Sequence, residues 1–452
     1  MSTWSSDAVF YHIYPIGLLD APLMNDVNAT VVSRLPGLSH WIPHIHDLGC
    51  NALYLGPLFE SGTHGYDTID YRRVDRRLGT NEDLKALIRD FHQRGIRVIL
   101  DGVFNHVSRE FPQFLDLREH GEASPYRDWF HNITFGKRSP RGDPFTYEAW
   151  AGNFELVKLN LQNPDVRDYL FTTVRGWFAE FDIDGLRLDA ADVIDKDFLR
   201  DLAATCRAAN PDCWIIGEIV HGDYREWANP EMLDSATNYE CFKGLYSSLN
   251  DRNFFEIAHS LTRQYGPEGI YRDLLLYSFA DNHDVDRVAS LLKDDRDLFP
   301  LYALLFTIPG TPSLYYGSEW GYKGRKKSGD DGPLRPSFTW PVPEEIKEHP
   351  ELEVWIRRLA TIHHQTSALQ TGSYEELYVA GSQIAFLRRS EEQVAVIVVN
   401  AAHQTSILRL GVSLADGTVL TDALDPAQAF TVHDGVLDLG DVAAATTKIL
   451  VS

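Results

Sequence analysis

The stretch DIDGLRLDAADVI (Asp182–Ile194) decides the fold of this 452-residue chain. Leu186 and Leu188 alternate with Arg187 and Asp189, which is the period-2 pattern of a strand with one apolar face. Because Arg187 and Asp189 lie on the same face, the guanidinium can orient the carboxylate and keep it ionised. A carboxylate that is oriented and ionised in this way is suited to act as a nucleophile. A structural salt bridge is the alternative that this strand alone leaves open.

A helix is predicted directly before this strand, and another directly after it. Apolar side chains recur at helical spacing from Pro164 to Phe181, and Asn163 is a suitable N-cap in front of Pro164. A second helix follows from Lys196. Helix, strand and helix in succession are typical of a parallel α/β sheet, in which functional groups gather at the carboxyl ends of the strands.

Strands and helices alternate along most of the chain. The helix after Thr80 begins with a capping box to Asp83, and Gly95 ends it. Weaker elements run through residues 236–264. Further strands are expected at residues 8–16, 51–57, 96–104, 213–219, 274–279 and 313–316, and further helices at residues 39–48, 198–209, 285–292, 298–306 and 351–364. About eight alternations are what a closed (β/α)8 TIM barrel requires.

Two regions depart from this alternation. Residues 106–160 are rich in aromatic side chains and lack periodicity, which indicates a small domain inserted after the third strand. After residue 371, short β-type runs are separated by polar turns, and Asp434-Gly435 is a hairpin signal. The predicted fold is therefore α/β: a barrel from residues 1–105 and 161–371, an inserted domain at 106–160, and an all-β sandwich domain at 372–452.

Composition excludes several classes of function. The net charge of −23 argues against nucleic acid and anionic membranes as partners. No apolar run reaches the length of a membrane span, and the N-terminus lacks the basic and apolar regions of a secretory signal. The four cysteines show no metal-binding spacing. They are Cys50, Cys206, Cys213 and Cys241. Reduced thiols in a cytoplasmic protein are the expectation.

Polar clusters stand at four predicted strand ends. They are Asp101–His106, Arg187–Asp189, Gly217-Glu218 and Asp281–Asp284. In a barrel these residues converge on one face from separate strands. Three carboxylates, two histidines and an arginine suit acid–base and covalent chemistry on a neutral polyol. No glycine-rich nucleotide loop or cluster of metal ligands competes for this role.

These clusters resemble the four sequence regions of glycoside hydrolase family 13, the α-amylase family. The matching segments are DGVFNH, GLRLDA, GEI and FADNHD, followed by GYDTIDY at 65–71, LVKLN at 156–160 and PGTPSLYYG at 309–317. The chain is most similar to the group of cyclomaltodextrinases, neopullulanases and maltogenic amylases, because KLNxxNP and DWF recur there.

The resemblance implies a retaining mechanism on α-linked glucose. Asp189 would be the nucleophile, Glu218 the general acid/base, and Asp284 the group that stabilises the oxocarbenium-like transition state. A retaining pair must lie about 5–5.5 Å apart. Glu218 ends an apolar strand, where desolvation would raise its pKa, whereas Arg187 would keep Asp189 charged.

The same matching implies the residues that bind substrate. His106 and His283 would donate to sugar hydroxyls, and Tyr66 would stack on the sugar ring. Buried, hydrogen-bonded histidines and a core tyrosine are the ordinary alternatives. Asp331 and Arg335 resemble a pair that lines the donor side of the cleft, with a surface ion pair as the alternative.

The sequence also departs from the group. The chain begins at the first barrel strand, without the group's N-terminal β domain, so a homodimer is one of several open oligomeric states. Val220 and Leu186 stand where the group has tryptophan, and DNHD replaces DSHD. Asn105 matches a calcium ligand of many α-amylases, but no further oxygen ligands can be placed. No required metal or other cofactor is expected.

The leading hypothesis is a cytoplasmic hydrolase of short or cyclic maltooligosaccharides. It would cleave α-1,4 bonds, and α-1,6 bonds as that group often does. A transglycosylase or isomerase that uses the same glycosyl-enzyme intermediate is the alternative. A barrel that only binds or scaffolds is disfavoured, because all three carboxylates are present.

Overall fold

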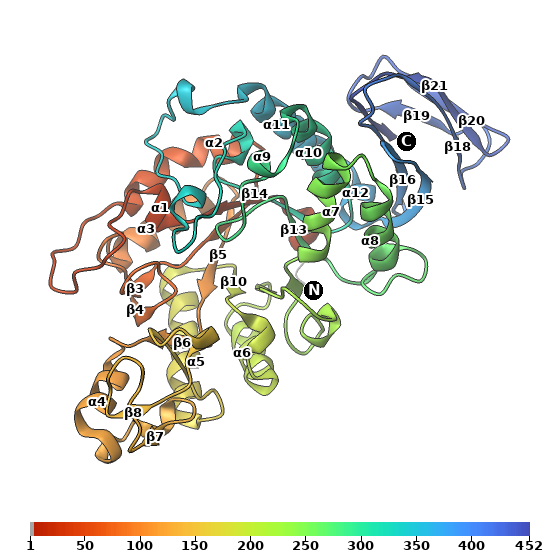
Figure 1. Ribbon diagram of the computed structural model, residues 1–452. Coiled ribbons are helices and arrows are strands. Elements are labelled where there is room, and N and C mark those ends of the chain that lie inside the picture. The colour runs from red at the N-terminus through yellow and green to blue at the C-terminus, as the bar shows by residue number, and fades with distance from the viewer. Residues whose placement is uncertain (1–3) are drawn as a thin grey trace.

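The computed structural model describes residues 4–452 and contains a barrel of eight parallel strands (Figure 1). The barrel strands are β1 (Phe10–Ile13), β2 (Ala52–Leu55), β5 (Arg97–Gly102), β10 (Gly185–Leu188), β11 (Trp214–Gly217), β12 (Ser235–Ala236), β13 (Tyr277–Phe279) and β14 (Thr311–Tyr315). Their order is β12-β11-β10-β5-β2-β1-β14-β13. A parallel bridge between Thr237 and Tyr277 joins the two end strands. The predicted barrel is therefore confirmed.

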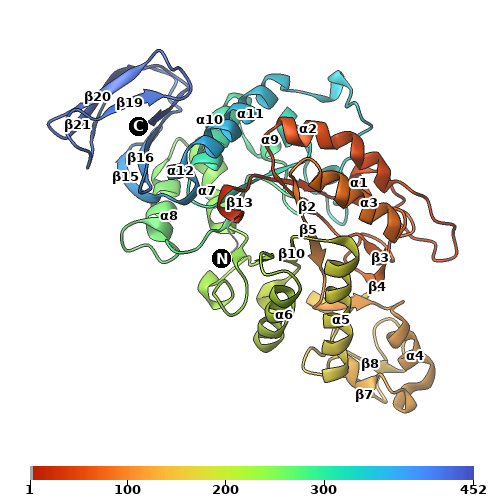
Figure 2. The ribbon, with the colours of Figure 1, turned by 180° about the vertical axis from the view of Figure 1, so that it is seen from behind.

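Helices cover the outside of the barrel (Figures 1 and 2). They are α1 (Pro15–Leu18), α2 (Ile42–Asp47), α3 (Asn81–His92), α5 (Pro164–Phe181), α6 (Lys196–Ala209), α7 (Tyr239–Asn250), α8 (Phe255–Tyr265), α9 (Val288–Leu291), α10 (Leu298–Thr307), α11 (Pro350–Gln365) and α12 (Ser367–Thr371). The predicted caps are confirmed. Thr80 and Asp83 form a reciprocal capping box, and the Asn163 side chain accepts from the N–H groups of Asp165 and Val166.

Several elements are shorter than the sequence predicted. The first two barrel strands, β1 and β2, have four residues each, because only these residues form ladder hydrogen bonds with the neighbouring parallel strands. The predicted helix at 39–48 is a 3-10 helix over Leu35–Trp41 followed by α2. Pro43 lacks an N–H donor and stands near the start of α2, where that donor is not needed. The two-residue strand β12 was not predicted.

The region between β5 and α5 is an insertion with short strands and a helix of its own. Strand β6 (His106–Ser108) pairs antiparallel with β9 (Leu156–Lys158), so the two ends of the segment meet at the barrel. Between them lie α4 (Pro112–His120), β7 (Thr134–Phe135) and β8 (Phe145–Thr146). Phe114 packs edge-on against Phe130, Phe145 and Tyr147. Most of the aromatic side chains in this region are therefore a local core.

The C-terminal region is all-β and antiparallel, as predicted. Its strands are β15 (Ser373–Val379), β16 (Gln383–Arg389), β17 (Val394–Asn400), β18 (Ser406–Gly411), β19 (Val419–Asp422), β20 (Ala429–His433), β21 (Val436–Val442) and β22 (Thr446–Val451). Their order is β15-β16-β17-β22-β19-β20-β21-β18, and the end strands β15 and β18 contact each other. The sheet thus folds over an apolar core of its own.

Two further observations bear on the predicted setting of the protein. Among residues 4–452, no helix is both long enough and apolar enough to cross a lipid bilayer. All four cysteines are buried and unpaired.

Gly185 lies at a close approach of β10 and β11. A Cβ atom at this position would lie 2.0 Å from the carbonyl oxygen of Trp214. Gly185→Ala should therefore force the strands apart, lower the free energy of unfolding by about 1–3 kcal/mol and reduce activity. Urea denaturation and initial rates measure both effects. Gly176→Ala is the control, because no atom lies within 4 Å of its Cβ position on α5. Equal behaviour of the two variants would contradict this close approach.

Candidate active site

A cavity of about 460 Å³ opens at the carboxyl ends of the barrel strands. It contains seven of the nine predicted site residues, which are Tyr66, His106, Asp189, Glu218, Asp284, Asp331 and Arg335. The other two, Arg187 and His283, are almost completely buried and contact residues of the lining. The structure thus brings all nine residues together.

Strand register places Asp189 and Glu218 side by side. Leu188 of β10 pairs with Gly217 of β11. Asp189 directly follows Leu188, and Glu218 directly follows Gly217. The backbone continues the pairing, because the Glu218 N–H donates to the Leu188 carbonyl at 2.9 Å. Neighbouring parallel strands of equal register therefore deliver two carboxyl groups to one end of the barrel.

Arg187 is the centre of a buried network of charges. Its Nη1 lies 3.1 Å from Asp101 and 3.2 Å from Asp189, and its Nη2 lies 3.0 Å from Glu218. The predicted ion pair of Arg187 with Asp189 is present, but the same guanidinium is shared with two other carboxylates. The Ala190 N–H adds a hydrogen bond of 3.0 Å to Glu218.

This sharing corrects the predicted protonation of Asp189. Burial and the nearby Glu218 raise the pKa of Asp189 well above its usual value, although Arg187 opposes them. The sequence predicted that Arg187 would keep Asp189 ionised, which assumed that Arg187 served this carboxylate alone. Because Arg187 is divided among three acids, it does not offset the burial of Asp189 and the negative charge of Glu218 beside it.

Asp284 has the opposite electrostatic setting. Burial alone would raise its pKa, but His283 at 2.9 Å and Arg335 at 2.9 Å hold the pKa well below its usual value. Asp284 is therefore a fixed negative charge. It projects into the same cavity as Asp189 and Glu218.

Aromatic rings hold His283 in place. The ring of His283 lies nearly parallel to Tyr66, with centroids 5.5 Å apart, and to Tyr14, with centroids 5.8 Å apart. The Tyr66 hydroxyl contacts His283 Nε2 and donates to Asp101 at 3.1 Å. His283 and Tyr66 are thus packed, hydrogen-bonded residues that also belong to the site.

His106 and Trp150 form a wall from the region between β5 and α5. Their rings are stacked at 6.0 Å, and burial lowers the pKa of His106 to about 4, so its imidazole is neutral near pH 7. Asn105 Nδ2 lies 3.2 Å from His106 Nδ1, which makes Nε2 the donor to the Tyr66 carbonyl at 3.0 Å. The donor predicted to reach a sugar hydroxyl is thus engaged with the backbone here.

Sequence reasoning missed part of the cavity lining. His64, Trp150, Leu156 and Asp192 line it and were not named as site residues. Trp150 was one of many aromatic residues in a region without periodicity, and no motif distinguished it. Burial and the charge of Glu218 raise the pKa of Asp192, which adds another acid beside Glu218.

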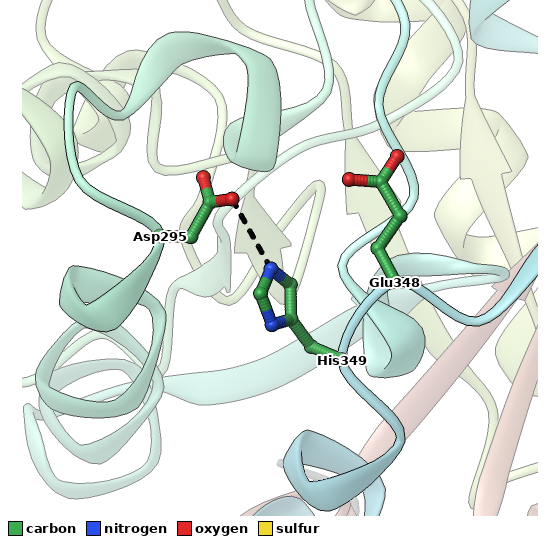
Figure 3. Close-up of side chains that lie close together, drawn as sticks. All are labelled: Asp295, Glu348 and His349. Atoms are coloured by element: carbon green, nitrogen blue, oxygen red, sulfur yellow. Dashed lines mark hydrogen bonds and ion pairs between the residues drawn. The ribbon is translucent and has the colours of Figure 1, made fainter.

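One group of potential metal ligands exists among residues 4–452, and it lies outside the cavity (Figure 3). It consists of Asp295, Glu348 and His349. Asp295 lies 3.2 Å from His349, as the dashed line shows, and the Lys323 ammonium lies 2.7 Å from Asp295 and 3.1 Å from Glu348. Lys323 already supplies the positive charge that these carboxylates need, so the group is explained as an ion-pair network.

Comparisons with known proteins identify relatives of this chain. Cyclomaltodextrinase from a Bacillus species is 32% identical over 418 residues, which are 88% of this chain and 73% of the relative. Intracellular maltogenic amylase of Bacillus subtilis is 30% identical over 417 residues, covering 88% of this chain and 69% of the relative.

Solved structures match the chain over almost its full length. A debranching enzyme from Nostoc punctiforme has a TM-score of 0.82 at 29% identity, with 100% of this chain and 99% of that chain covered. Cyclic α-maltosyl-(1→6)-maltose hydrolase from Arthrobacter globiformis has a TM-score of 0.80 at 28% identity, with the same coverage. The family profile described as the catalytic domain of α-amylase matches residues 23–353. This chain therefore belongs to the α-amylase family, glycoside hydrolase family 13.

Proposed function

We propose that this protein is a retaining α-glucoside hydrolase that cleaves α-1,4 and α-1,6 bonds of short or cyclic maltooligosaccharides. The observation that supports the proposal most is the convergence of Asp189, Glu218 and Asp284 on one cavity of about 460 Å³. The cavity lies within the range of small-molecule sites and suits a few sugar units rather than a long polymer surface.

In the first step, Glu218 donates a proton to the glycosidic oxygen while Asp189 attacks the anomeric carbon. The glycosidic C–O bond breaks, the protonated sugar leaves, and a covalent glycosyl–Asp189 ester forms. Arg187 contacts both carboxyl groups, at 3.2 Å and 3.0 Å, and so fixes their mutual position.

In the second step, Glu218 takes a proton from water, and the water oxygen attacks the anomeric carbon and releases Asp189. Both steps develop positive charge on the sugar ring. Asp284 is held ionised by His283 and Arg335, so it offers a fixed negative charge without reorganisation. Arg335 is itself held 3.2 Å from Asp331.

The matched structures support the choice of substrate. The Arthrobacter protein is named a hydrolase of cyclic α-maltosyl-(1→6)-maltose, and the Nostoc protein is named a debranching enzyme; both are matched over 99% of their length. Val220 lines the cavity two positions after Glu218 and is 38% exposed, so this position offers a small aliphatic side chain rather than an aromatic ring. Such a side chain fits the varied leaving groups of a mixed α-1,4 and α-1,6 specificity.

We place the enzyme in the cytoplasm. The Bacillus subtilis relative is named an intracellular maltogenic amylase, and the four unpaired cysteines of this chain suit a reducing compartment.

Incubation with cyclomaltodextrins, pullulan, panose and cyclic α-1,6-containing oligosaccharides tests the activity. We expect release of glucose or maltose, with the α-anomer formed first in NMR spectra. Glu218→Gln should reduce kcat by at least about a thousandfold, because it removes the proton donor. Glu226→Gln is the matched control, since Glu226 is exposed and pairs with Lys196 outside the cavity.

Failure to release sugar from any of these substrates would disprove the proposal, and a first-formed β-anomer would disprove the retaining mechanism. Longer products at high sugar concentration would instead assign the intermediate to transglycosylation.

Asp189 should destabilise the fold at neutral pH. Its pKa is higher in the folded than in the unfolded chain, so the cost in stability begins as the pH rises above about 4, the unfolded pKa, and is complete above the folded pKa; well below pH 4 both states are protonated and there is no cost. Asp189→Asn should therefore have a higher Tm than the native protein at pH 7, and the difference should shrink as the pH falls to 4. Asp168→Asn, at an exposed position of α5, is the control in calorimetry. A difference that grows on acidification would reverse the sign of the inferred shift.

The region around Asn105 does not fit a calcium ion. Its side chain is engaged with His106, and the Lys158 ammonium, paired with Glu148 at 2.7 Å, lines the adjoining cavity. Asp195 also lines that cavity but caps α6 through the Phe198 N–H. We expect dialysis against EDTA to change kcat by less than about twofold and to leave the Tm unchanged, because the Lys158 ammonium already supplies positive charge beside this cavity. Activity lost to EDTA and restored by calcium chloride would refute this.

A further inference from the structure

Trp150 differs from the other tryptophans of this chain. Of the ten tryptophans, all of which lie within residues 4–452, every one except Trp150 packs in or against the hydrophobic core. Trp150 is instead half-buried and lines the cavity of about 460 Å³ that holds the three acids. Tryptophan is a large apolar side chain that is mostly buried in folded proteins, so a tryptophan outside the core calls for a physical reason.

The contacts of Trp150 leave part of its side chain uncommitted. Among the described residues, its one ring partner is His106, which lies nearly parallel to it, with 9° between the planes and centroids 6.0 Å apart. Its indole N–H has no hydrogen-bond partner in the part of the chain that the structure describes. The N–H groups of Trp177 and Trp320, in contrast, donate to protein acceptors. Trp150 therefore brings a partly exposed ring and an unused donor to the cavity.

The backbone around Trp150 is held in an uncommon conformation. Ala151 has φ 49° and ψ 28°, in the left-handed region, which is unfavourable for alanine because Cβ comes close to the carbonyl oxygen. Strain of this kind is often retained at ligand sites. On the other side of Trp150, Ala149 forms an antiparallel bridge with Val157 of β9. The ring is thus presented by an ordered turn, which lowers the entropy that a ligand would lose by fixing it.

The rest of the lining explains what such a ring offers to a sugar. Five carboxylates line the cavity, and they are Asp189, Asp192, Glu218, Asp284 and Asp331. The insertion between β5 and α5 adds the apolar side chains of Trp150 and Leu156. A pyranose ring carries hydroxyl groups around its rim and C–H groups on its faces. A sugar can therefore bond the carboxylates through its rim while one face packs on the indole, as in other sites that combine apolar walls with a few polar groups.

His106 lies between Trp150 and the residues that surround the acids. Its Nε2 donates to the Tyr66 carbonyl at 3.0 Å, and its ring stacks on Trp150. Tyr66 in turn stacks on His283, which contacts Asp284. Trp150 is thus the outer member of this series of contacts. Because the sugar that is cleaved has to lie against the acids, the indole is placed for a neighbouring sugar unit.

We propose that Trp150 is a stacking platform for a second sugar ring of the substrate, adjacent to the ring whose bond is cleaved. The C–H face of this second sugar packs on the indole, and the indole N–H donates to one of its hydroxyls. The inference rests on the proposed function, because it assigns a residue to the recognition of the same oligosaccharide. Substrates of two or more sugar rings gain affinity from Trp150, whereas a single sugar ring does not.

Kinetics with substrates of different length test this platform. Trp150→Ala should lower kcat/KM for maltotriose about tenfold, mainly through a higher KM, because the sugar loses apolar contact area. The same variant should retain the native kcat/KM for α-glucosyl fluoride, which has a single sugar ring. Trp150→Phe keeps an aromatic ring and should stay within about threefold of the native chain on maltotriose. Phe255→Ala, at an exposed position of α8 outside the cavity, is the matched control.

Binding without turnover separates this inference from the proposed hydrolysis. In a Glu218→Gln background, Trp150→Ala should weaken the binding of maltotriose about tenfold in calorimetric titration, and Phe255→Ala should leave it unchanged. Equal losses on maltotriose and α-glucosyl fluoride would assign Trp150 to the support of His106 and overturn the platform, as would unchanged binding of maltotriose. A native chain that binds maltotriose through Trp150 but releases no sugar would overturn the hydrolysis alone.

Discussion

One guanidinium, that of Arg187, determines the electrostatics of the barrel's carboxyl end. It is 5% exposed and contacts the carboxylates of Asp101, Asp189 and Glu218 at 3.0–3.2 Å. Replacing Arg187 or one of its acidic partners by a neutral residue would leave a buried charge uncompensated. That change would cost far more free energy than the intact network contributes to stability. The acids can therefore stand close together in this largely buried site only while Arg187 lies between them.

The remaining groups depend on this arrangement in turn. Asp101 accepts from the hydroxyls of Tyr54 and Tyr66, and Tyr66 stacks on His283, which holds Asp284. A continuous chain of contacts thus leads from one fixed charge to the other. This chain of contacts explains how two acids in opposite electrostatic settings share one cavity. Asp189 lies beside the negative charge of Glu218, whereas Asp284 is held between His283 and Arg335.

Much of this fold could be predicted from the sequence, because its signals are local. The capping box of Thr80 and Asp83 and the cap of Asn163 are decided by neighbouring residues, and both are as expected. Strand β12 could not be found, since two residues show no periodicity. The protonation of Asp189 was also beyond reach, because it depends on how Arg187 is divided among residues from three strands. Motifs identified the acids, but their mutual influence is a property of strand register.

The wall that carries Trp150 comes from a segment whose ends meet through the short pair β6 and β9. Its interior holds an aromatic cluster around Phe114, which is continuous with the main hydrophobic core. Residues on the cleft side of this segment can change without altering the acids, which are anchored at the ends of barrel strands. Selection could therefore retune which sugars enter while leaving bond cleavage intact, so that substrate preference and chemical competence evolve along separate paths in this scaffold.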